Sequence, residues 1–341
     1  QQGESQIATM QQWLVERRYG AWFIDRYLAP MTAAIWSAPP AQLGRFPARF
    51  LLGFMRNHGL LQLRDRPQWR TIVGGSRRYV QSLADPLLRR QPVGAAAPRI
   101  ELGRPVSAIR RRSDGVRLLS GGVAYDYDAV VLATHADVSL RLLADADGRE
   151  RDVLASFPYQ SNSAALHTDR SFLPRRRRAW ASWNCRLRMD AAGGLASSVE
   201  RNDSGHEQPG EANPPAGVCV TYDLGRLQGV ETDRPLLLTL NAEDAIDPQQ
   251  TLREFRFDHP AYGIRSRTAQ EQYDWINGRG GVYYCGAYWG YGFHEDGVAS
   301  GIRAAAALGA DWETCIAAST KATSSTIVDG TSSTPCVDRN G

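Results

Sequence analysis

The sequence predicts an α/β protein that also contains a part built from helices and antiparallel strands. Apolar and aromatic residues recur at helical spacing over residues 5–36 and again over residues 41–58. Residues 129–134 form a short apolar run rich in valine, which is typical of a buried parallel strand. Residues 282–308 have the order of a strand, a glycine-rich loop and a helix of small side chains. These three patterns predict a parallel sheet beside a helical half.

The other elements follow from similar patterns. Pro30 is expected to end the first helical run at Ala29, because proline disfavours the helical conformation of the residue before it. His58 and Gly59 are expected to end the second run. Further helices are predicted at 77–89 and 136–143, and strands at 100–102, 106–110, 116–119, 125–127, 163–166, 178–184, 218–222 and 236–240.

Length and charge limit the classes of protein that need be considered. The 341 residues suit two interleaved domains or one large α/β unit. The net charge of +4, from 40 basic and 36 acidic side chains, is a mild imbalance, and no nucleic-acid recognition motif accompanies it. We therefore expect a small-molecule partner and no nucleic acid.

Two arginine runs, Arg110–Arg112 and Arg175–Arg178, concentrate part of this charge. The simpler interpretation is that they are solvated turns or strand ends. The alternative is a patch for anionic lipid or for a phosphorylated substrate, which would give a peripheral membrane contact through Arg175–Arg178.

The cysteines and the start of the chain bear on location. The five cysteines are scattered, and neither a CxxC pair nor a zinc-type spacing occurs, so we expect free thiols and no metal. The first residues lack the basic start and apolar core of a signal peptide. These features predict a cytoplasmic protein. The first residue is Gln1 and not methionine, so an incomplete version of a longer protein is also expected.

The segment 282–308 suits a redox cofactor for a chemical reason. A reduced isoalloxazine ring carries negative charge, which free backbone N–H groups and the positive end of a helix dipole stabilise. Glycines at 286 and 297 let the backbone approach such a ring. The alternative is a glycine- and aromatic-rich loop that only caps a helix, because glycine loops alone are weak evidence.

Four longer strings carry a resemblance to a known family: GAYWGYGFHEDGVASG at 286–301, LHTD at 166–169, PRRRRAWASWN at 174–184 and DAVVLATHADVSLRLL at 128–143. They resemble the FAD-dependent amine-oxidase and phytoene-desaturase superfamily, and within it a group of predicted NAD/FAD-binding oxidoreductases. The resemblance runs from about Met10 to Trp312. It implies a Rossmann-like FAD-binding domain, with FAD as the cofactor.

The resemblance assigns cofactor contacts to Gly74, Gly75, Val106, Ala133, Thr134, Gly286, Glu295, Gly297 and Val298. It implies that Gly297 and Val298 offer backbone N–H groups to the pyrimidine end of the flavin. Gly286 would lie near the ribityl chain or the pyrophosphate, and the backbone of Val106 would contact the adenine. Residues 133–134 would form a second approach to the dinucleotide.

Catalytic candidates lie in the same segment. His294, three residues before Gly297, could transfer a proton together with Glu295, or both could only cap the helix. Tyr288 and Trp289 could wall the substrate face of the ring, or they could be core residues. The sequence leaves these alternatives open.

The superfamily's first βαβ unit with its GxGxxG turn is missing from this sequence, so the FAD-binding domain is expected to be incomplete. The predicted organisation is a substrate domain at 1–68 and 148–271, interleaved with an FAD-binding domain at 69–147 and 272–312, a flexible insertion at 191–216 and a Ser/Thr-rich tail at 313–341. The expected function is hydride transfer from a C–H or C–N bond of an apolar, lipid-like substrate to FAD. The alternative is a non-catalytic flavoprotein remnant that binds a lipid or a partner.

Overall fold

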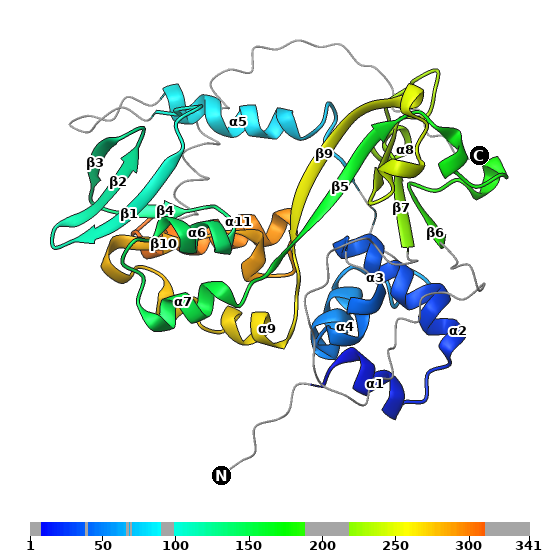
Figure 1. The fold of residues 1–341 in the computed structure, drawn as a ribbon, viewed down its shortest axis with the longest axis horizontal. Helices are drawn as coiled ribbons and strands as arrows, with labels where there is room; N and C mark the ends of the chain where they lie inside the picture. Colours follow the sequence, from blue (N-terminus) through cyan, green and yellow to red (C-terminus); the bar gives the residue numbers. More distant parts are fainter. Residues whose placement is uncertain are drawn as a thin grey trace.

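The computed structural model describes residues 8–37, 40–65, 68, 70–89, 99–187 and 218–310. Within these residues it confirms the α/β class, with one small parallel sheet, two antiparallel sheets and helices around them (Figure 1). The insertion predicted at 191–216 and the tail predicted at 313–341 lie outside the described residues. None of the described helices is long and apolar enough to cross a membrane.

The N-terminal helices form a separate group with its own core (Figure 1). They are α1 Met10–Glu16, α2 Ala21–Phe23, the π-helix η1 Ile24–Leu28, α3 Ala29–Trp36, the 3-10 helix η2 Pro40–Arg45 and α4 Ala48–Asn57. Their apolar faces meet around Leu51 and Phe46, which are 0% and 1% exposed. The helix pattern of the sequence therefore reflects burial in this group.

Pro30 does not end the first helical run, contrary to the sequence prediction. The chain passes from α2 through η1 into α3, with Pro30 in the first turn of α3. The N–H of Ala29 donates to the carbonyl of Ile24, five residues earlier. This wider turn changes the hydrogen-bonding pattern just before the proline. Pro30 then stands in the first turn of α3, where the missing N–H of a proline is tolerated.

The parallel sheet has two strands in the described residues, β4 Val130–Leu132 and β10 Val282–Tyr284. Beside it lies the antiparallel sheet of β1 Val106–Arg112, β2 Gly115–Ser120 and β3 Val123–Tyr127. The strand predicted at 100–102 does not form. Residues 102–103 make a turn instead.

One core joins these strands to the helices α6 Ala136–Leu142, α7 Gly148–Ala155, α9 Ile264–Gln270, α10 Tyr273–Ile276 and η8 Ala287–Trp289. The 3-10 helix η7 Arg279–Gly281 and helix α11 His294–Ala307 flank β10 on either side in the chain. At the centre of the core Tyr284, Leu154 and Ile276 are 0% exposed. α7, which the sequence assigned to the substrate domain, contributes Val153 and Leu154 to this core.

The third sheet has the order β6-β7-β8-β5-β9. Its strands are β5 Tyr159–His167, β6 Trp183–Leu187, β7 Val218–Asp223, β8 Leu237–Leu240 and β9 Thr251–Pro260, and all neighbours are antiparallel. Four short helices and α8 Leu224–Gln228 surround it: η3 Arg170–Phe172, η4 Arg177–Ala179, η5 Glu243–Ala245 and η6 Pro248–Gln250. The strand predicted at 178–184 begins only at Trp183, because residues 177–179 turn helically. β9 was not predicted.

The long strands β5 and β9 run side by side from this sheet to the parallel-sheet half (Figure 1). Cys185, Cys219 and Cys285, the described cysteines, are free thiols.

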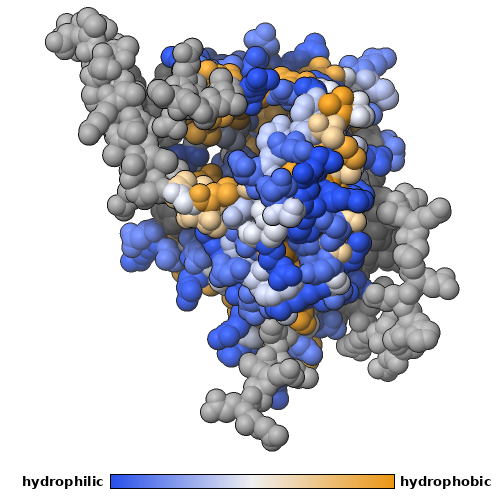
Figure 2. All heavy atoms as spheres, turned by 90° about the vertical axis from the view of Figure 1, so that its left-hand side faces the viewer, coloured by the Kyte–Doolittle hydropathy of each residue, from blue (hydrophilic) through white to orange (hydrophobic). Residues whose placement is uncertain are grey.

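Helix α5 Ser76–Arg89 forms as predicted but buries none of its side chains in the described chain. Leu83 is 71% exposed, and Val73, just before the helix, is 89% exposed. Figure 2 shows a face of the molecule that is mostly hydrophilic, with hydrophobic side chains gathered in its upper part.

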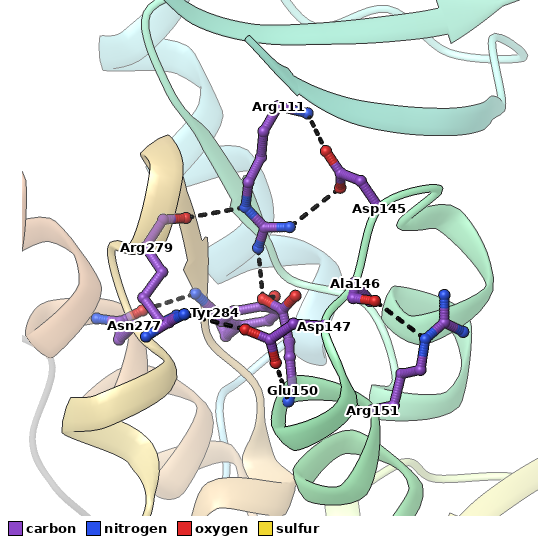
Figure 3. Close-up of polar contacts among 9 residues, drawn as sticks. All are labelled: Arg111, Asp145, Ala146, Asp147, Glu150, Arg151, Asn277, Arg279 and Tyr284. Carbon is purple, nitrogen blue, oxygen red and sulfur yellow. Dashed lines mark hydrogen bonds and ion pairs between the residues drawn. The ribbon is translucent and has the colours of Figure 1, made fainter. Parts of the chain in front are cut away.

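A charged network ties the meander of β1–β3 to β10 and α7 (Figure 3). Glu150 is 1% exposed and pairs with the guanidinium of Arg111. The Tyr284 hydroxyl donates to the same carboxylate at 2.6 Å. Arg111 also donates to Asp145 at 3.0 Å and to the carbonyl of Arg279 at 3.1 Å. The network satisfies a carboxylate that burial alone would strongly disfavour.

His167 of β5 gives the five-stranded sheet a predicted sensitivity to acid. It is 0% exposed, its Nδ1 accepts the N–H of Asp169 at 3.1 Å, and its Nε2 lies 2.7 Å from the Thr239 hydroxyl. Burial lowers the pKa of His167, although Asp169 opposes the shift. The unfolded chain therefore binds more protons, and the stability is lost as pH falls below the unfolded pKa of about 6.5.

We expect the unfolding free energy to fall as the pH drops below about 6.5, by up to about 1.4 kcal/mol per pH unit and per proton. Denaturant titration across this range measures the slope. His167→Asn keeps an acceptor near Nδ1 but does not titrate, so it should flatten the profile. Burial also lowers the pKa of His259, so this histidine can contribute to the same slope. The slope of His259→Asn is measured beside that of His167→Asn, to separate the contributions of the two histidines. An unchanged slope in His167→Asn would contradict the assignment.

Candidate functional site

The carboxyl ends of β4 and β10 meet at one edge of the parallel sheet. Leu132 pairs with Tyr284, and the N–H of Cys285 donates to the carbonyl of Leu132 at 3.0 Å. Ala133 and Thr134 therefore leave the sheet beside Gly286. Ligands of open α/β sheets bind outside the carboxyl ends of the strands, so this edge is the candidate site.

Gly286 makes the turn out of β10, and its lack of a side chain is required. Its φ is 154°, and a Cβ there would lie 2.5 Å from Cε1 of Tyr288. The N–H of Gly286 donates to Oγ of Ser300 at 2.9 Å, and the Ser300 hydroxyl is within reach of the carbonyls of Gly286 and Gly297. Ser300, which is 3% exposed, thus fixes the turn against helix α11.

The loop between β10 and α11 is held by three hydrogen bonds from two other helices, α9 and α3. Nε2 of Gln270 donates to the carbonyls of Tyr288 at 2.9 Å and Gly290 at 2.6 Å. From the helical half, Nε1 of Trp36 donates to the carbonyl of Tyr291 at 2.9 Å. The loop conformation is therefore set by buried donors on other elements.

Helix α11 presents its N-terminus at this edge. The N–H groups of His294, Glu295 and Asp296 have no carbonyl partner within the helix, because they belong to its first turn. The N–H of Gly297 donates to the carbonyl of Phe293 at 3.1 Å. From the sequence, Gly297 and Val298 were expected to offer free N–H groups. Because the helix begins at His294, the free N–H groups are instead those of the preceding residues, His294 to Asp296. Val298 is 52% exposed on the outer side of α11.

Tyr288 and Trp289 do not wall the site, contrary to one of the two sequence interpretations. They are 3% and 8% exposed and pack in the core against Phe157. Their hydroxyl and Nε1 atoms are buried with no hydrogen-bond partner in the described structure. Burial also raises the pKa of Tyr288 far above its usual value, so this hydroxyl stays protonated. The core interpretation holds for both rings.

His294 and Glu295 are exposed at the start of α11. The His294 ring lies edge-on to Tyr79, with ring centroids 6.3 Å apart. Tyr79 is in the first turn of α5, just after Gly74 and Gly75. These two glycines have φ values of 84° and 78°, which suits the tight turn predicted for them. The contact brings the turn before α5 towards the N-terminus of α11.

Two predicted contacts lie at the margins of this arrangement. Val106 begins β1 and packs, half-buried, against the core of the parallel-sheet half. Thr134 has its hydroxyl 2.8 Å from that of Ser139, so it holds the start of α6. The arginines of the run Arg175–Arg178 are exposed around η4, and their contact with a membrane stays a prediction.

The donor set fits the flavin end of an FAD molecule. It combines the free N–H groups at the N-terminus of α11, a helix of 14 residues, with a glycine turn at the edge of the parallel sheet. Glu295 and Asp296 place negative charge there, but the Asp296 carboxylate accepts the N–H of Phe293 at 2.9 Å and caps the helix. Among the described residues, the parallel sheet has only β4 and β10, and a glycine-rich turn for the pyrophosphate does not accompany them.

Several residues that organise the site were not singled out from the sequence. Gln270 and Ser300 supply hydrogen bonds that hold the loop, and the Tyr273 hydroxyl lies within hydrogen-bond distance of the carbonyls of Tyr284, at 3.0 Å, and Ser300, at 3.2 Å. Each is a common polar residue within a helix, with no motif around it. The only hint is a glutamine or serine on an otherwise apolar helix face.

Solved structures with a similar fold include two amine oxidases and a fatty acid isomerase. Cyclohexylamine oxidase from Brevibacterium oxydans is 15% identical, with a TM-score of 0.53 over 88% of this chain and 67% of that chain. Putrescine oxidase is 13% identical, with a TM-score of 0.55 over 89% of this chain and 68% of that one. A fatty acid isomerase from P. acnes is 13% identical, with a TM-score of 0.50 over 86% and 65%. The chain spans about two thirds of the length of such proteins.

These likenesses concern the fold, because the identities are low. No curated protein sequence matches the chain. The sequence family described as flavin containing amine oxidoreductase matches residues 16–309, which is most of the chain and includes the whole candidate site. The chain therefore belongs to the flavin-containing amine oxidoreductase family, whose cofactor is FAD.

Proposed function

We propose that the protein is an FAD-dependent oxidoreductase that takes a hydride from a C–H or C–N bond of an apolar, lipid-like substrate. One observation carries the proposal: the carboxyl ends of β4 and β10 meet at the N-terminus of α11. When bound, FAD supplies the hydride acceptor. The chain contributes the free N–H groups and the dipole of α11, which favour the negative charge of a reduced ring.

The surroundings of the loop support an apolar substrate. Phe50 and Phe54 of α4 meet Tyr291, with ring centroids 4.7 Å and 5.7 Å apart, and Phe293 stacks on Phe54 at 5.0 Å. This aromatic cluster joins the helical half directly to the candidate flavin site. The named relatives include oxidases of amines, so an amine with an apolar body is the closest variant of the proposal.

Reconstitution tests the proposal. The purified chain is incubated with FAD, freed of excess cofactor and examined by visible absorption. We expect the bands of protein-bound flavin, which bleach when an oxidisable apolar amine or unsaturated lipid is added without oxygen. A colourless protein after reconstitution would support the alternative, a non-catalytic flavoprotein remnant.

Two glycine-to-alanine changes on α11 test which turn of the helix the flavin ring contacts. A Cβ at Gly297 would have only the Ala287 nitrogen, 3.9 Å away, as a neighbour, and one at Gly301 would meet nothing within 4 Å. Both changes should therefore stabilise the helix, by up to about 1 kcal/mol. If the ring lies against the first turn of α11, Gly297→Ala alone should weaken FAD binding, by about tenfold, which is about 1.4 kcal/mol.

Gly301→Ala, one turn further along the helix, is the matched control. Flavin fluorescence titration gives the two affinities, and thermal melts give the two stabilities. Equal FAD affinity in both variants would place the ring elsewhere.

A further inference from the structure

We propose that a surface cavity beside helix α8 binds a small zwitterion with an apolar body, of about the size of a dipeptide. The anionic group of this ligand would lie at Arg170 and Arg177, and its ammonium group at Glu231 and Asp233. The inference goes beyond the proposed function, because α8 lies at the end of the molecule away from β4 and β10 (Figure 1).

The cavity lies between two separate segments of the chain. One wall comes from residues 170–180, which include η3 and η4, and the other comes from residues 223–236, which include α8 and the loop before β8. The cavity volume is about 330 Å³, which is within the range of cavities that hold small molecules. The space therefore suits a ligand of dipeptide size.

Hydrogen bonds hold both walls in place. In the first wall, Nε1 of Trp180 donates to the carbonyl of Pro174 at 2.8 Å, which fixes the indole ring. In the second, Asp223 is 5% exposed and accepts the N–H of Arg226 at 3.2 Å. The same carboxylate pairs with the guanidinium of Arg226 at 3.3 Å, so these two charges are satisfied within the wall.

The other charges of the two walls have opposite signs and do not pair with each other. Arg170 and Arg177 are exposed in the first wall, and Glu231 and Asp233 are exposed in the second. Among the described residues, none of these four side chains takes part in an ion pair. The Arg177 guanidinium lies 5.2 Å from the centre of the Trp180 ring, which holds it at the cavity. The cavity therefore offers two cations from one wall and two anions from the other.

This arrangement favours a molecule that carries both charges. A guanidinium forms paired hydrogen bonds with a carboxylate, and a carboxylate accepts from an ammonium group. A simple anion would be repelled by the acidic wall, and a simple cation by the arginines. Trp180, Val230 and Pro235 also line the cavity and offer apolar surface to the body of the ligand.

Isothermal titration calorimetry with three matched peptides tests the site. Glycyl-phenylalanine carries both charges, its C-terminal amide lacks the carboxylate, and its N-acetyl form lacks the ammonium group. We expect glycyl-phenylalanine to bind about fivefold more tightly than either of the other two, because each of them loses one charge-assisted contact.

Variants of the two walls assign each contact. Arg177→Gln should weaken the binding of the dipeptide and of its N-acetyl form about fivefold, and it should leave the amide unchanged. Glu231→Gln should weaken the dipeptide and the amide by a similar factor and leave the N-acetyl form unchanged. The controls are Arg175→Gln, in the same arginine run but not in the cavity lining, and Glu254→Gln, an exposed carboxylate on β9. Both controls should keep all three dissociation constants within about twofold.

Thermal melts check that the variants remain folded, and visible absorption measures their bound FAD, which none of the changes should alter. Equal affinities of the native protein for the three peptides would overturn the inference. Unchanged dipeptide binding in Arg177→Gln and Glu231→Gln would overturn it as well. An equal loss in Arg175→Gln and Arg177→Gln would show a general effect of surface charge and would also refute the cavity.

Discussion

Replacing Glu150 with alanine should lower the free energy of unfolding by about 3–5 kcal/mol. The carboxylate is 1% exposed and is the shared partner of Arg111 and the Tyr284 hydroxyl. Without it, a mostly buried guanidinium and a fully buried hydroxyl lose their acceptor. Arg111 would keep Asp145, which is 30% exposed, and the loss would fall mainly on the contact between α7 and β10.

Urea denaturation followed by circular dichroism measures the change. Glu150→Gln keeps an acceptor oxygen for both donors and removes only the charge, so its loss should be smaller, about 1–3 kcal/mol. The control is Asp274→Ala. Asp274 pairs with Arg303 at 2.7 Å but is 90% exposed, and such surface pairs contribute about 1 kcal/mol or less. Equal losses in Glu150→Ala and Asp274→Ala would contradict the structural role of the buried pair.

Replacing Gly286 with alanine should abolish FAD binding and destabilise the fold by about 2 kcal/mol or more. The new Cβ would lie 2.5 Å and 2.8 Å from two carbons of the Tyr288 ring. That ring is buried and cannot swing away, so the turn after β10 must move. The start of α11 would move with it, because Ser300 ties Gly286 to this helix.

A double-mutant cycle separates this clash from a general loss of folding. Tyr288→Ala is expected to be destabilising, because it leaves a cavity in the core. In the presence of Tyr288→Ala, however, Gly286→Ala should cost clearly less than it does alone. Additive losses would show that the backbone conformation at Gly286, and not the Tyr288 ring, makes the glycine necessary. Flavin absorbance of each variant reports the cofactor site directly.

The sequence predicted the elements that have a strong local pattern. The apolar run at 129–134 became the parallel strand β4, in which Leu132 is buried and Val131 is 41% exposed. The glycines after β10 and the small residues of α11 predicted the strand–loop–helix unit, and the resemblance of the longer strings gave its family. Gly286 was singled out because a glycine lets the backbone approach a cofactor ring and because the resemblance implies a contact there, and the structure adds a φ of 154° at this turn.

β9 was missed because an edge strand exposed on both faces has charged residues between its phenylalanines and little apolar periodicity. Pro30 was expected to end a helix. The π-helix η1 before it places Pro30 in the first turn of the next helix, α3, where its missing N–H is tolerated. In both cases the missing information was the hydrogen-bonding partner, and not the identity of the residue.

What the sequence determined by itself is the fold class, which local periodicity encodes, and the family, through the resemblance of its longer strings, which also implies the edge at which a flavin is expected. The tertiary structure alone decided which side chains face that edge. It buried Tyr288 and Trp289 in the core, and it started helix α11 at His294, so that Gly297 already donates its N–H to the carbonyl of Phe293. Side-chain direction depends on packing between residues far apart in the chain, and a single sequence carries no record of those contacts.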